Sequence, residues 1–234
     1  MGLRVIFFGM AGNFSVPPLA GLIATDSVEI VAVVTLPQQP AAATRPRRLD
    51  PPRPAPSDLP ILNPYLDQNI WHLAWSHCIP VWEVGKLTEQ PALQLLASLR
   101  PDLLVVACFS QRLPPTLLQL PRFGCLNLHP SLLPAYRGPT PLFWQARQGE
   151  AQAGVTLHFL DEGLDTGDLV AQTAWAWPVG ATEAELESQC AEAGTGLLLE
   201  AVQQLGRERA LPRRPQPAGQ GSYFPWPATE SASG

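Results

Sequence analysis

The fold is decided by a stretch near the start of the chain, LRVIFFGMAGNFSVPPLAGLIATDSVEIVAVVT, at residues 3–35. Its apolar runs at residues 3–8 and 29–35 predict two buried strands. Between them, a turn at residues 9–13 leads into a helix that Ser15 can cap and that tolerates Pro17 and Pro18 in its first turn. A strand, a helix and a second strand in succession predict parallel pairing with a right-handed crossover.

The same alternation continues along the chain. Short apolar runs predict strands at residues 79–82, 102–108, 125–128, 155–160 and 169–177. Thr88 predicts the start of a helix that ends near residue 99, and a capping box of Thr182 and Glu185 predicts a helix that ends near Gly206. The apolar residues of that last helix fall at helical spacing and predict its buried stripe: Leu186, Cys190, Ala193, Leu197, Ala201 and Leu205.

The connection between the last two predicted strands is too short to hold the helix of a strand-helix-strand unit, so we expect these strands to pair antiparallel. The sequence therefore predicts an α/β fold: a Rossmann-like, mostly parallel sheet with helices on both faces and an antiparallel edge.

Composition excludes several classes of protein. The 234 residues allow one substantial core, and a formal charge of −5 argues against a globally basic nucleic-acid binder. The 4 cysteines lack metal-ligand spacing, and three lie in apolar stretches, so we expect buried free thiols. No targeting segment and no membrane span is apparent, which predicts a soluble cytoplasmic protein.

Two segments stand apart from the alternation. Residues 37–64 are rich in proline and carry Arg45, Arg47, Arg48 and Arg53, which predicts an extended surface loop. It can be a solvated insertion or an arm that meets phosphates of a substrate. From residue 211 the chain is again proline-rich, and we expect a loosely attached tail. The predicted organisation is one domain at residues 1–210, which includes the loop at 37–64, followed by a tail at 211–234.

The chemistry is concentrated in CLNLHPSLLPAYRG, at residues 125–138. Asn127 and His129 are two residues apart, so in a strand both point to one face, while Leu126 and Leu128 point to the other. Pro130 ends the strand pairing because it has no N–H to donate. The strand thus delivers a hydrogen-bond donor and a proton carrier at the sheet edge where α/β proteins usually bind ligands.

A second motif follows in GVTLHFLDEGLDTGD, at residues 154–168. Gly163 and Gly167 permit backbone angles closed to other residues, which would bring Asp165 close to whatever the loop surrounds. Asn127 can donate to an oxygen that gains negative charge, His129 can move a proton, and Asp165 can orient the imidazole or hold a relaying water. His158 is expected to lie within a strand, to face away from the side of Asp161 and to be structural.

These motifs resemble the folate-dependent formyltransferases. The resemblance is carried by Asn127-Leu128-His129, by residues 131–134 (SLLP), by Arg137-Gly138 and by residues 164–167 (LDTG), and it extends from about residue 3 to residue 177. Within the family, the stretches FFGMAGNFSVPPLAGLIA and GLDTGD are most similar to the catalytic half of methionyl-tRNA formyltransferases. TPLFW and GVTLH are also similar to formyltransferases that modify amino sugars on nucleotides.

The resemblance implies a reaction and a set of site residues. The co-substrate would be 10-formyltetrahydrofolate, the acceptor a primary amine, and the catalytic residues Asn127, His129 and Asp165. The folate side would be formed by three segments that match family positions: Phe109, Gln111, Arg112 and Leu113; Ser131, Leu132, Leu133 and Pro134; Asp161, Glu162, Gly163 and Leu164. The amine side would be formed by Asn13, Phe14, Arg137 and Gly138, with Arg137 binding a phosphate or carboxylate or, alternatively, bridging a surface carboxylate.

The acceptor stays open at this point. Initiator tRNA, an amino sugar nucleotide, glycinamide ribotide and, for a hydrolase, water all fit the motifs, and a non-catalytic folate-binding domain is a further alternative. Full-length methionyl-tRNA formyltransferases carry an additional C-terminal tRNA-binding domain that is expected to be lacking here. The sequence predicts no metal site, because the acidic loop at 161–168 lacks the calcium pattern and His72 and His77 lack zinc spacing. It does not indicate an oligomeric state.

Overall fold

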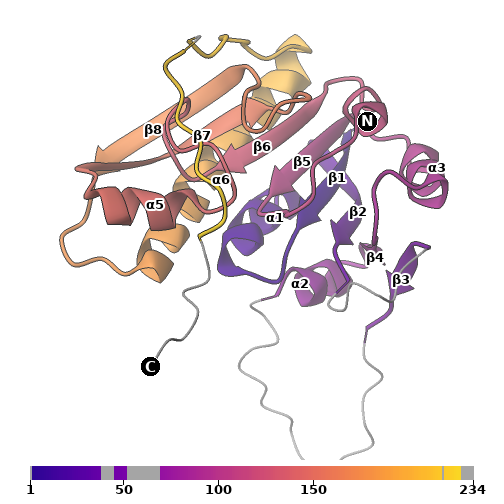
Figure 1. Ribbon diagram of the computed structural model, residues 1–234. Coiled ribbons are helices and arrows are strands. Elements are labelled where there is room, and N and C mark those ends of the chain that lie inside the picture. Colours follow the sequence, from indigo (N-terminus) through magenta and orange to yellow (C-terminus); the bar gives the residue numbers. More distant parts are fainter. Residues whose placement is uncertain (1, 38–44, 52–68, 218, 228–234) are drawn as a thin grey trace, which may run out of the picture.

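A computed structural model describes residues 2–37, 45–51, 69–217 and 219–227 of the chain. These residues form an eight-stranded sheet in the order β3-β4-β2-β1-β5-β6-β7-β8 (Figure 1). The strands are β1 (Leu3–Gly9), β2 (Val28–Thr35), β3 (Arg47–Leu49), β4 (Val81–Glu83), β5 (Leu103–Ala107), β6 (Cys125–His129), β7 (Gln152–Phe159) and β8 (Leu169–Ala176).

The middle of the sheet is parallel and its two margins are antiparallel. Strands β4, β2, β1, β5 and β6 pair parallel, β3 pairs antiparallel with β4, and β7 pairs antiparallel with both β6 and β8. The predicted α/β fold is therefore confirmed, including its antiparallel edge at β7 and β8. Because the central strands run the same way, the ends of β5 and β6 lie at one edge of the sheet, where the connecting loops can build a site.

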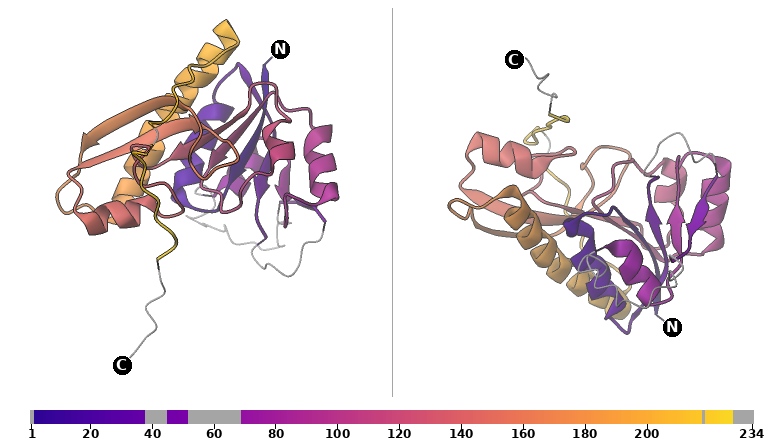
Figure 2. Two further views of the ribbon diagram at one scale, coloured as in Figure 1. Left: turned by 45° about the horizontal axis from the view of Figure 1, so that its top comes forward. Right: turned by 90° about the horizontal axis from the view of Figure 1, so that it is seen from below.

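Helices cover both faces of the sheet (Figure 2). One face packs against α1, α2 and α6, and the other packs against α3 and α4. The helices are α1 (Val16–Ile23), α2 (Ile70–Ser76), α3 (Gln90–Ser98), α4 (Pro115–Leu118), α5 (Pro141–Gln148) and α6 (Glu183–Glu208), and a 3-10 turn, η1 (Asn13–Ser15), precedes α1.

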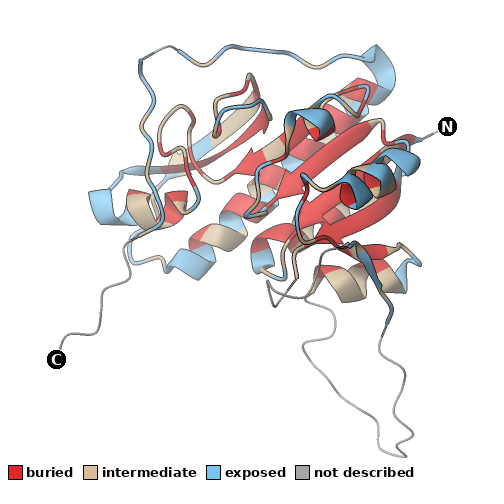
Figure 3. Cartoon of the chain, turned by 45° about the vertical axis from the view of Figure 1, so that its right-hand side comes forward, coloured by how far each residue is buried: buried red, intermediate tan, exposed pale blue. Residues whose placement is uncertain are grey.

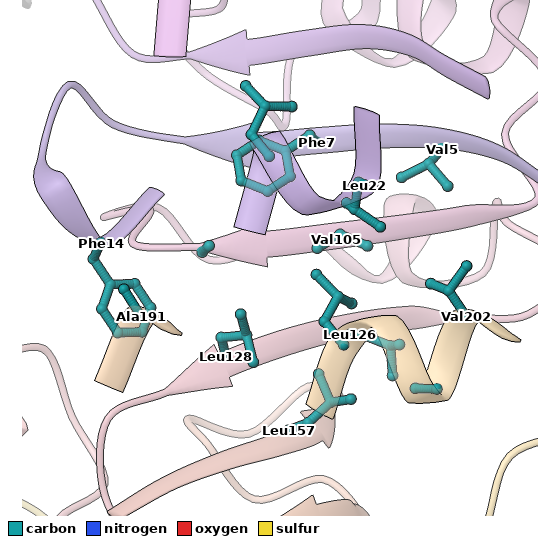
Figure 4. Close-up of a cluster of buried hydrophobic side chains, with 14 of the residues drawn as sticks. Val5, Phe7, Phe14, Leu22, Val105, Leu126, Leu128, Leu157, Ala191 and Val202 are labelled. Atoms are coloured by element: carbon teal, nitrogen blue, oxygen red, sulfur yellow. The ribbon is translucent and has the colours of Figure 1, made fainter. Parts of the chain in front are cut away.

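Alternation along β1 divides its side chains between two cores. Val5 and Phe7 belong to the core under α1, α2 and α6, whereas Ile6 and Phe8 belong to the core under α3 and α4. Figure 3 shows the central strands buried while the helices present exposed outer faces. Figure 4 shows Leu126 and Leu128 of β6 within the first core, together with Ala191 and Val202 of α6. As predicted, the apolar face of β6 anchors the strand that carries Asn127 and His129.

Several element ends differ from the sequence predictions. Ser15 is the N-cap residue of α1 but makes no capping bond, because its hydroxyl donates to Ala107 O and accepts from Met10 N–H. Helix α3 starts after Glu89 rather than Thr88, and β4 begins at Val81. The capping box of Thr182 and Glu185 is confirmed at α6.

The buried stripe of α6 includes residues that the predicted helical spacing missed. Leu186, Cys190, Ala201 and Leu205 are buried as predicted, but Ala193 and Leu197 are only partly buried. Ala191, Gly194, Leu198 and Val202 are buried instead. The face that contacts the sheet is therefore broader than the predicted line, as expected for a helix lying across several strands.

The predicted surface loop contains a strand in its described part. Arg47, Arg48 and Leu49 form β3 at the sheet edge, and the Arg47 guanidinium pairs with the Glu83 carboxylate 3.1 Å away. Residues 38–44 and 52–68, including Arg53, lie outside the described residues. The prediction that this segment meets a substrate is therefore not tested.

The described part of the C-terminal tail is firmly attached, which contradicts the prediction. Residues 211–217 and 219–227 form a segment that we call the strap, and it runs from the end of α6 back towards α5 (Figure 1). Arg214 and Leu169 exchange two backbone hydrogen bonds, Ser222 N–H donates to Pro134 O, and Trp144 Nε1 donates to Pro225 O. The Phe224 ring stacks on Tyr136 and on Trp144. The proline-rich composition did not predict these contacts.

The burial of the cysteines agrees only in part with the prediction. All four are free thiols, but only Cys125 and Cys190 are buried, while Cys78 and Cys108 are exposed. Among the described residues, no helix has the length and apolar character needed to cross a membrane.

Candidate active site

Strand β6 places Asn127 and His129 at the edge of the sheet where the strand ends. Asn127 is half-buried and His129 is only 4% exposed, although it lines a cavity. His129 Nε2 lies 2.8 Å from the main-chain oxygen of Tyr136. Because a carbonyl oxygen can only accept, Nε2 carries the hydrogen of the neutral ring, and Nδ1 is the nitrogen free to take up a proton.

Asp165 approaches from the loop between β7 and β8. Its Oδ2 lies 3.8 Å from His129 Nδ1 and accepts a hydrogen bond of 2.9 Å from Gly138 N–H. A separation of 3.8 Å is too long for a direct hydrogen bond but close enough for a strong electrostatic interaction with a charged imidazole. The structure thus brings together the three predicted catalytic side chains, Asn127, His129 and Asp165.

The backbone conformation that brings Asp165 inward differs from the predicted one. Asp165 itself has a positive φ of 54°, whereas neither Gly163 nor Gly167 does. The glycines are needed because there is no room for a side chain: a Cβ at Gly163 would lie 1.8 Å from Thr166 Oγ1, and one at Gly167 would lie 1.9 Å from Phe159 O. Close packing of the loop, and not left-handed glycines, folds the Asp165 carboxylate inward.

His158 belongs to the site, which corrects the expectation that it is only structural. Antiparallel pairing places it directly opposite Asn127, and its Nε2 lies 3.1 Å from Asn127 Nδ2 and 3.7 Å from Asp165 Oδ1. Complete burial and the neighbouring His129 lower the pKa of His158 to about 4, although Asp165 opposes the shift. His158 is therefore neutral near pH 7 and does not form an ion pair with Asp165.

The tautomer of His158 orients Asn127. His158 Nδ1 lies 2.8 Å from Phe159 O, which can only accept, so Nδ1 carries the hydrogen and Nε2 accepts from the Asn127 amide. One N–H of Asn127 is committed to His158. The second N–H remains available to a bound oxygen, because an amide nitrogen has two donors.

A cavity of about 610 Å³ lies beside these residues. This volume is typical of a site for a small molecule. The loop after β5 and the loop after β7 supply one group of lining residues, which includes Phe109, Gln111, Arg112, Leu113 and Leu164. A second group comes from η1, the start of α5, α6 and the strap.

The second group is acidic and aromatic. It includes Phe14, Glu183, Glu187, Tyr223 and Trp226. Burial and Glu183 raise the pKa of Glu187, although the backbone N–H of Phe14 opposes the shift. Tyr223 and Trp226 are 58% and 63% exposed, so these strap aromatics stand at the mouth of the cavity. Arg112 is the one Lys or Arg side chain that lines the cavity in the described part of the chain.

Thr140 offers a further polar group to the cavity. It is the N-cap residue of α5, makes no capping bond, and its buried Oγ1 has no hydrogen-bond partner among the described residues. Leaving a buried hydroxyl without a partner is energetically costly.

Many of the residues predicted for substrate contact line the cavity. On the folate side these are Phe109, Gln111, Arg112, Leu113, Asp161, Gly163 and Leu164, and on the amine side they are Phe14 and Gly138. The Gln111 side chain also donates to Gly85 O and accepts from Leu87 N–H, and Arg112 donates to Glu162 O. Both side chains therefore connect the loop after β5 to neighbouring loops.

The remaining predicted residues lie outside the cavity lining. Ser131, Leu132, Leu133, Pro134 and Glu162 are not among the lining residues, and neither are Asn13 and Arg137. Ser131 is buried and its hydroxyl donates to Ala135 O, which stabilises the turn after β6. The Arg137 guanidinium donates to Gln216 Oε1 of the strap at 2.6 Å and 3.2 Å. Contact of these residues with a substrate stays a prediction.

The sequence reasoning missed His158, Thr140, Glu183, Glu187 and the strap residues. For His158 the signal was incomplete, because its place opposite Asn127 depends on the register between β6 and β7. For the strap there was none, because many of its hydrogen bonds are made with main-chain atoms and its aromatic contacts join residues that are far apart in the sequence. Among the described residues, no group of three or more His, Cys, Asp or Glu side chains is arranged to hold a metal ion.

Comparison with known proteins identifies the family. The model of the formyl transferase family matches residues 3–202. A methionyl-tRNA formyltransferase from Synechococcus sp. (strain JA-3-3Ab) is 37% identical over 225 residues, which cover 95% of this chain and 64% of that protein. The chain thus spans a little under two thirds of this relative.

Solved structures share the fold. Phosphoribosylglycinamide formyltransferase from Anaplasma phagocytophilum superposes with a TM-score of 0.68 at 20% identity, covering 97% of this chain and 100% of that one. An N-formyltransferase from Helicobacter canadensis, solved in complex with folinic acid and dTDP-3-aminofucose, superposes with a TM-score of 0.64 at 19% identity, covering 97% and 71%. With the family match over most of its length, the chain belongs to the formyl transferase family.

Proposed function

We propose that this chain transfers a formyl group from 10-formyltetrahydrofolate to a primary amine. The observation that carries the proposal is the convergence of Asn127, His129 and Asp165 beside one cavity of ligand size. The cavity fits a folate on the side of the β5 and β7 loops, where Val106, Leu113 and Leu118 supply an apolar wall and loop backbone supplies polar groups. A cytoplasmic location, as expected from the sequence, is part of the proposal.

Each side chain has a role that follows from its geometry. The amine nitrogen forms a bond to the formyl carbon, and the C=O electron pair moves to the formyl oxygen. The free N–H of Asn127 donates to that oxygen as it gains negative charge. His129 takes the proton of the amine at Nδ1, and Asp165 stabilises the resulting imidazolium. The electron pair on the oxygen then re-forms the C=O bond as the C–N10 bond breaks, and N10 gains the proton from His129, which a water held by His129 Nδ1 and Asp165 Oδ2 can relay.

The residues that line the cavity favour some acceptors over others. Glu183 and Glu187 favour an acceptor that presents an amine, and Phe14, Tyr223 and Trp226 favour apolar or flat groups next to it. The lining argues against a small phosphate-bearing amine. Among the described lining residues, the one Lys or Arg side chain that could bind a phosphate is Arg112, and it lies on the folate side. The acidic and aromatic lining, together with the 37% identity to a methionyl-tRNA formyltransferase, favours methionyl-tRNA as the acceptor.

A screen of acceptors tests the function. Purified chain is incubated with 10-formyltetrahydrofolate and either methionyl-tRNA, glycinamide ribotide, an amino sugar nucleotide or no amine, and release of tetrahydrofolate is followed. We expect release with methionyl-tRNA and formylation of its amino group. Transfer should weaken steeply between low and moderate salt, because tRNA binding releases counterions. Equal release without any amine would instead identify a hydrolase, and no release under any condition would refute the proposal.

A further inference from the structure

Gln216 uses its whole side-chain amide to join three segments of the chain. Its Nε2 donates to the main-chain oxygens of Asp165 and Gly167, at 2.9 Å and 2.8 Å. Its Oε1 accepts two hydrogen bonds from the Arg137 guanidinium. These four bonds use both donors and both acceptor sites of a glutamine side chain.

The first two bonds hold the backbone that presents the catalytic carboxylate. Asp165 has a φ of 54°, a conformation that is unfavourable for a residue with a Cβ and persists only where the surroundings hold it. The carbonyls of Asp165 and Gly167 flank Thr166, so Gln216 fixes the chain immediately after Asp165. A loop held at these two points keeps the Asp165 carboxylate aimed at His129.

The other two bonds hold the segment that carries the hydrogen-bond donor of Asp165. Arg137 N–H donates to Ser222 O, and Phe224 N–H donates to Arg137 O, both at 2.9 Å. The next residue, Gly138, donates its N–H to Asp165 Oδ2. Gly138 has a φ of 120°, and a Cβ there would lie 2.1 Å from Phe224 O, so the strap passes against this backbone. The strap therefore contacts both partners of the Gly138–Asp165 hydrogen bond.

We propose that Gln216 is a positioning residue for Asp165, and that the strap is thereby part of the catalytic unit. The family match ends at residue 202, before the strap begins. Gln216 acts through two main-chain carbonyls and the Arg137 guanidinium, and it contacts no reacting group in this arrangement. The inference rests on the proposed function for its catalytic consequence, whereas its structural consequence can be measured without any substrate.

Three full-length variants test the role. Gln216→Met keeps the length of the side chain and removes all four bonds. Gln216→Glu keeps an acceptor for Arg137 but replaces the NH₂ group, which supplies both donors, with one carboxylate oxygen that repels the two carbonyls. Gln220→Met makes the same change as the first variant at an exposed position of the same strap and is the matched control.

Two measurements are made on each variant. The first is hydrogen exchange of the Gly138 amide by NMR, which we expect to become at least about fivefold faster in both Gln216 variants and unchanged in Gln220→Met. The second is formyl transfer with 10-formyltetrahydrofolate and methionyl-tRNA. We expect kcat to fall roughly 10- to 100-fold in the Gln216 variants because Asp165 is displaced, with KM for the folate within about twofold of its value in the unmodified chain.

The results separate the two proposals. If the unmodified chain fails to formylate methionyl-tRNA, the proposed function fails, and the exchange measurement alone decides whether Gln216 positions Asp165. Exchange at Gly138 that matches the Gln220→Met control in both Gln216 variants would overturn the inference, even if kcat fell. Wild-type kcat in a Gln216→Glu variant would overturn it as well.

Discussion

The two imidazoles of the site differ in which ring nitrogen carries the hydrogen. Phe159 O sets the hydrogen of His158 on Nδ1, and Tyr136 O sets that of neutral His129 on Nε2. His158 therefore orients the Asn127 amide as a neutral acceptor, while His129 keeps Nδ1 facing Asp165. Two imidazoles in one site thus take two roles because each ring is anchored by a main-chain carbonyl on a different nitrogen.

Burial of neutral His158 predicts a pH dependence of stability. Its pKa in the folded protein is about 4, below the ordinary value of 6.5 for a histidine. Between these values the unfolded chain binds a proton that the folded chain does not, so the free energy of unfolding falls as the pH drops from 6.5 to 4. The full difference is on the order of 3 kcal/mol.

Denaturant unfolding across pH 4 to 7 measures this effect. The slope of stability against pH should be shallower in His158→Gln than in the unmodified chain, whatever the absolute stability of the variant. His77→Gln removes an exposed histidine from the end of α2 and should leave the slope unchanged. If His158→Gln keeps the full slope, His158 is not a buried neutral group.

At the level of elements, contact between α6 and the sheet depends on a glycine. A Cβ at Gly194 would lie 3.1 Å from Leu128 Cδ2 and 3.2 Å from Val155 Cγ2, whereas a Cβ at Gly196 would meet no atom within 4 Å. Gly194 thus lets the helix lie close to β6 and β7 beneath the catalytic residues, while Gly196 faces solvent.

The same substitution at these two positions should have different effects. We expect Gly194→Val to lower the free energy of unfolding by about 1–3 kcal/mol, because its added methyl groups overpack the core. Gly196→Val should change it by less than about 0.5 kcal/mol, since valine is a slightly better helix former than glycine and contacts nothing. Urea unfolding of both variants measures the difference. Equal losses at both positions would contradict the close contact at Gly194.

Element scale is also where the sequence was most informative. The alternation in β1, the two prolines of α1 and the capping box of α6 each depend on near neighbours in the chain, so the pattern predicted them. Ser15 shows where such predictions fail. Its hydroxyl donates a hydrogen bond to Ala107 O, which is distant in sequence, and does not cap the start of α1. His158 is a second such case, because its direction depends on the register with β6.

At the scale of the whole molecule, the site is assembled from segments that are far apart in the sequence. Strand β6 supplies Asn127 and His129, the loop after β7 supplies Asp165, and the strap holds that loop through Gln216. Motifs predicted the first three residues because their side chains carry the chemistry. The strap could not be predicted in this way, since main-chain carbonyls such as those of Asp165 and Gly167 leave no mark on the sequence.

The most direct test of the account is the turnover of a His129→Ala variant with 10-formyltetrahydrofolate and methionyl-tRNA. Circular dichroism and thermal unfolding first establish that the variant is folded. We expect turnover to fall roughly 10²- to 10⁴-fold, because no other side chain of the site is placed to take up the amine proton at that point. A folded His129→Ala variant that forms product at close to the rate of the unmodified chain would contradict the central role of this imidazole.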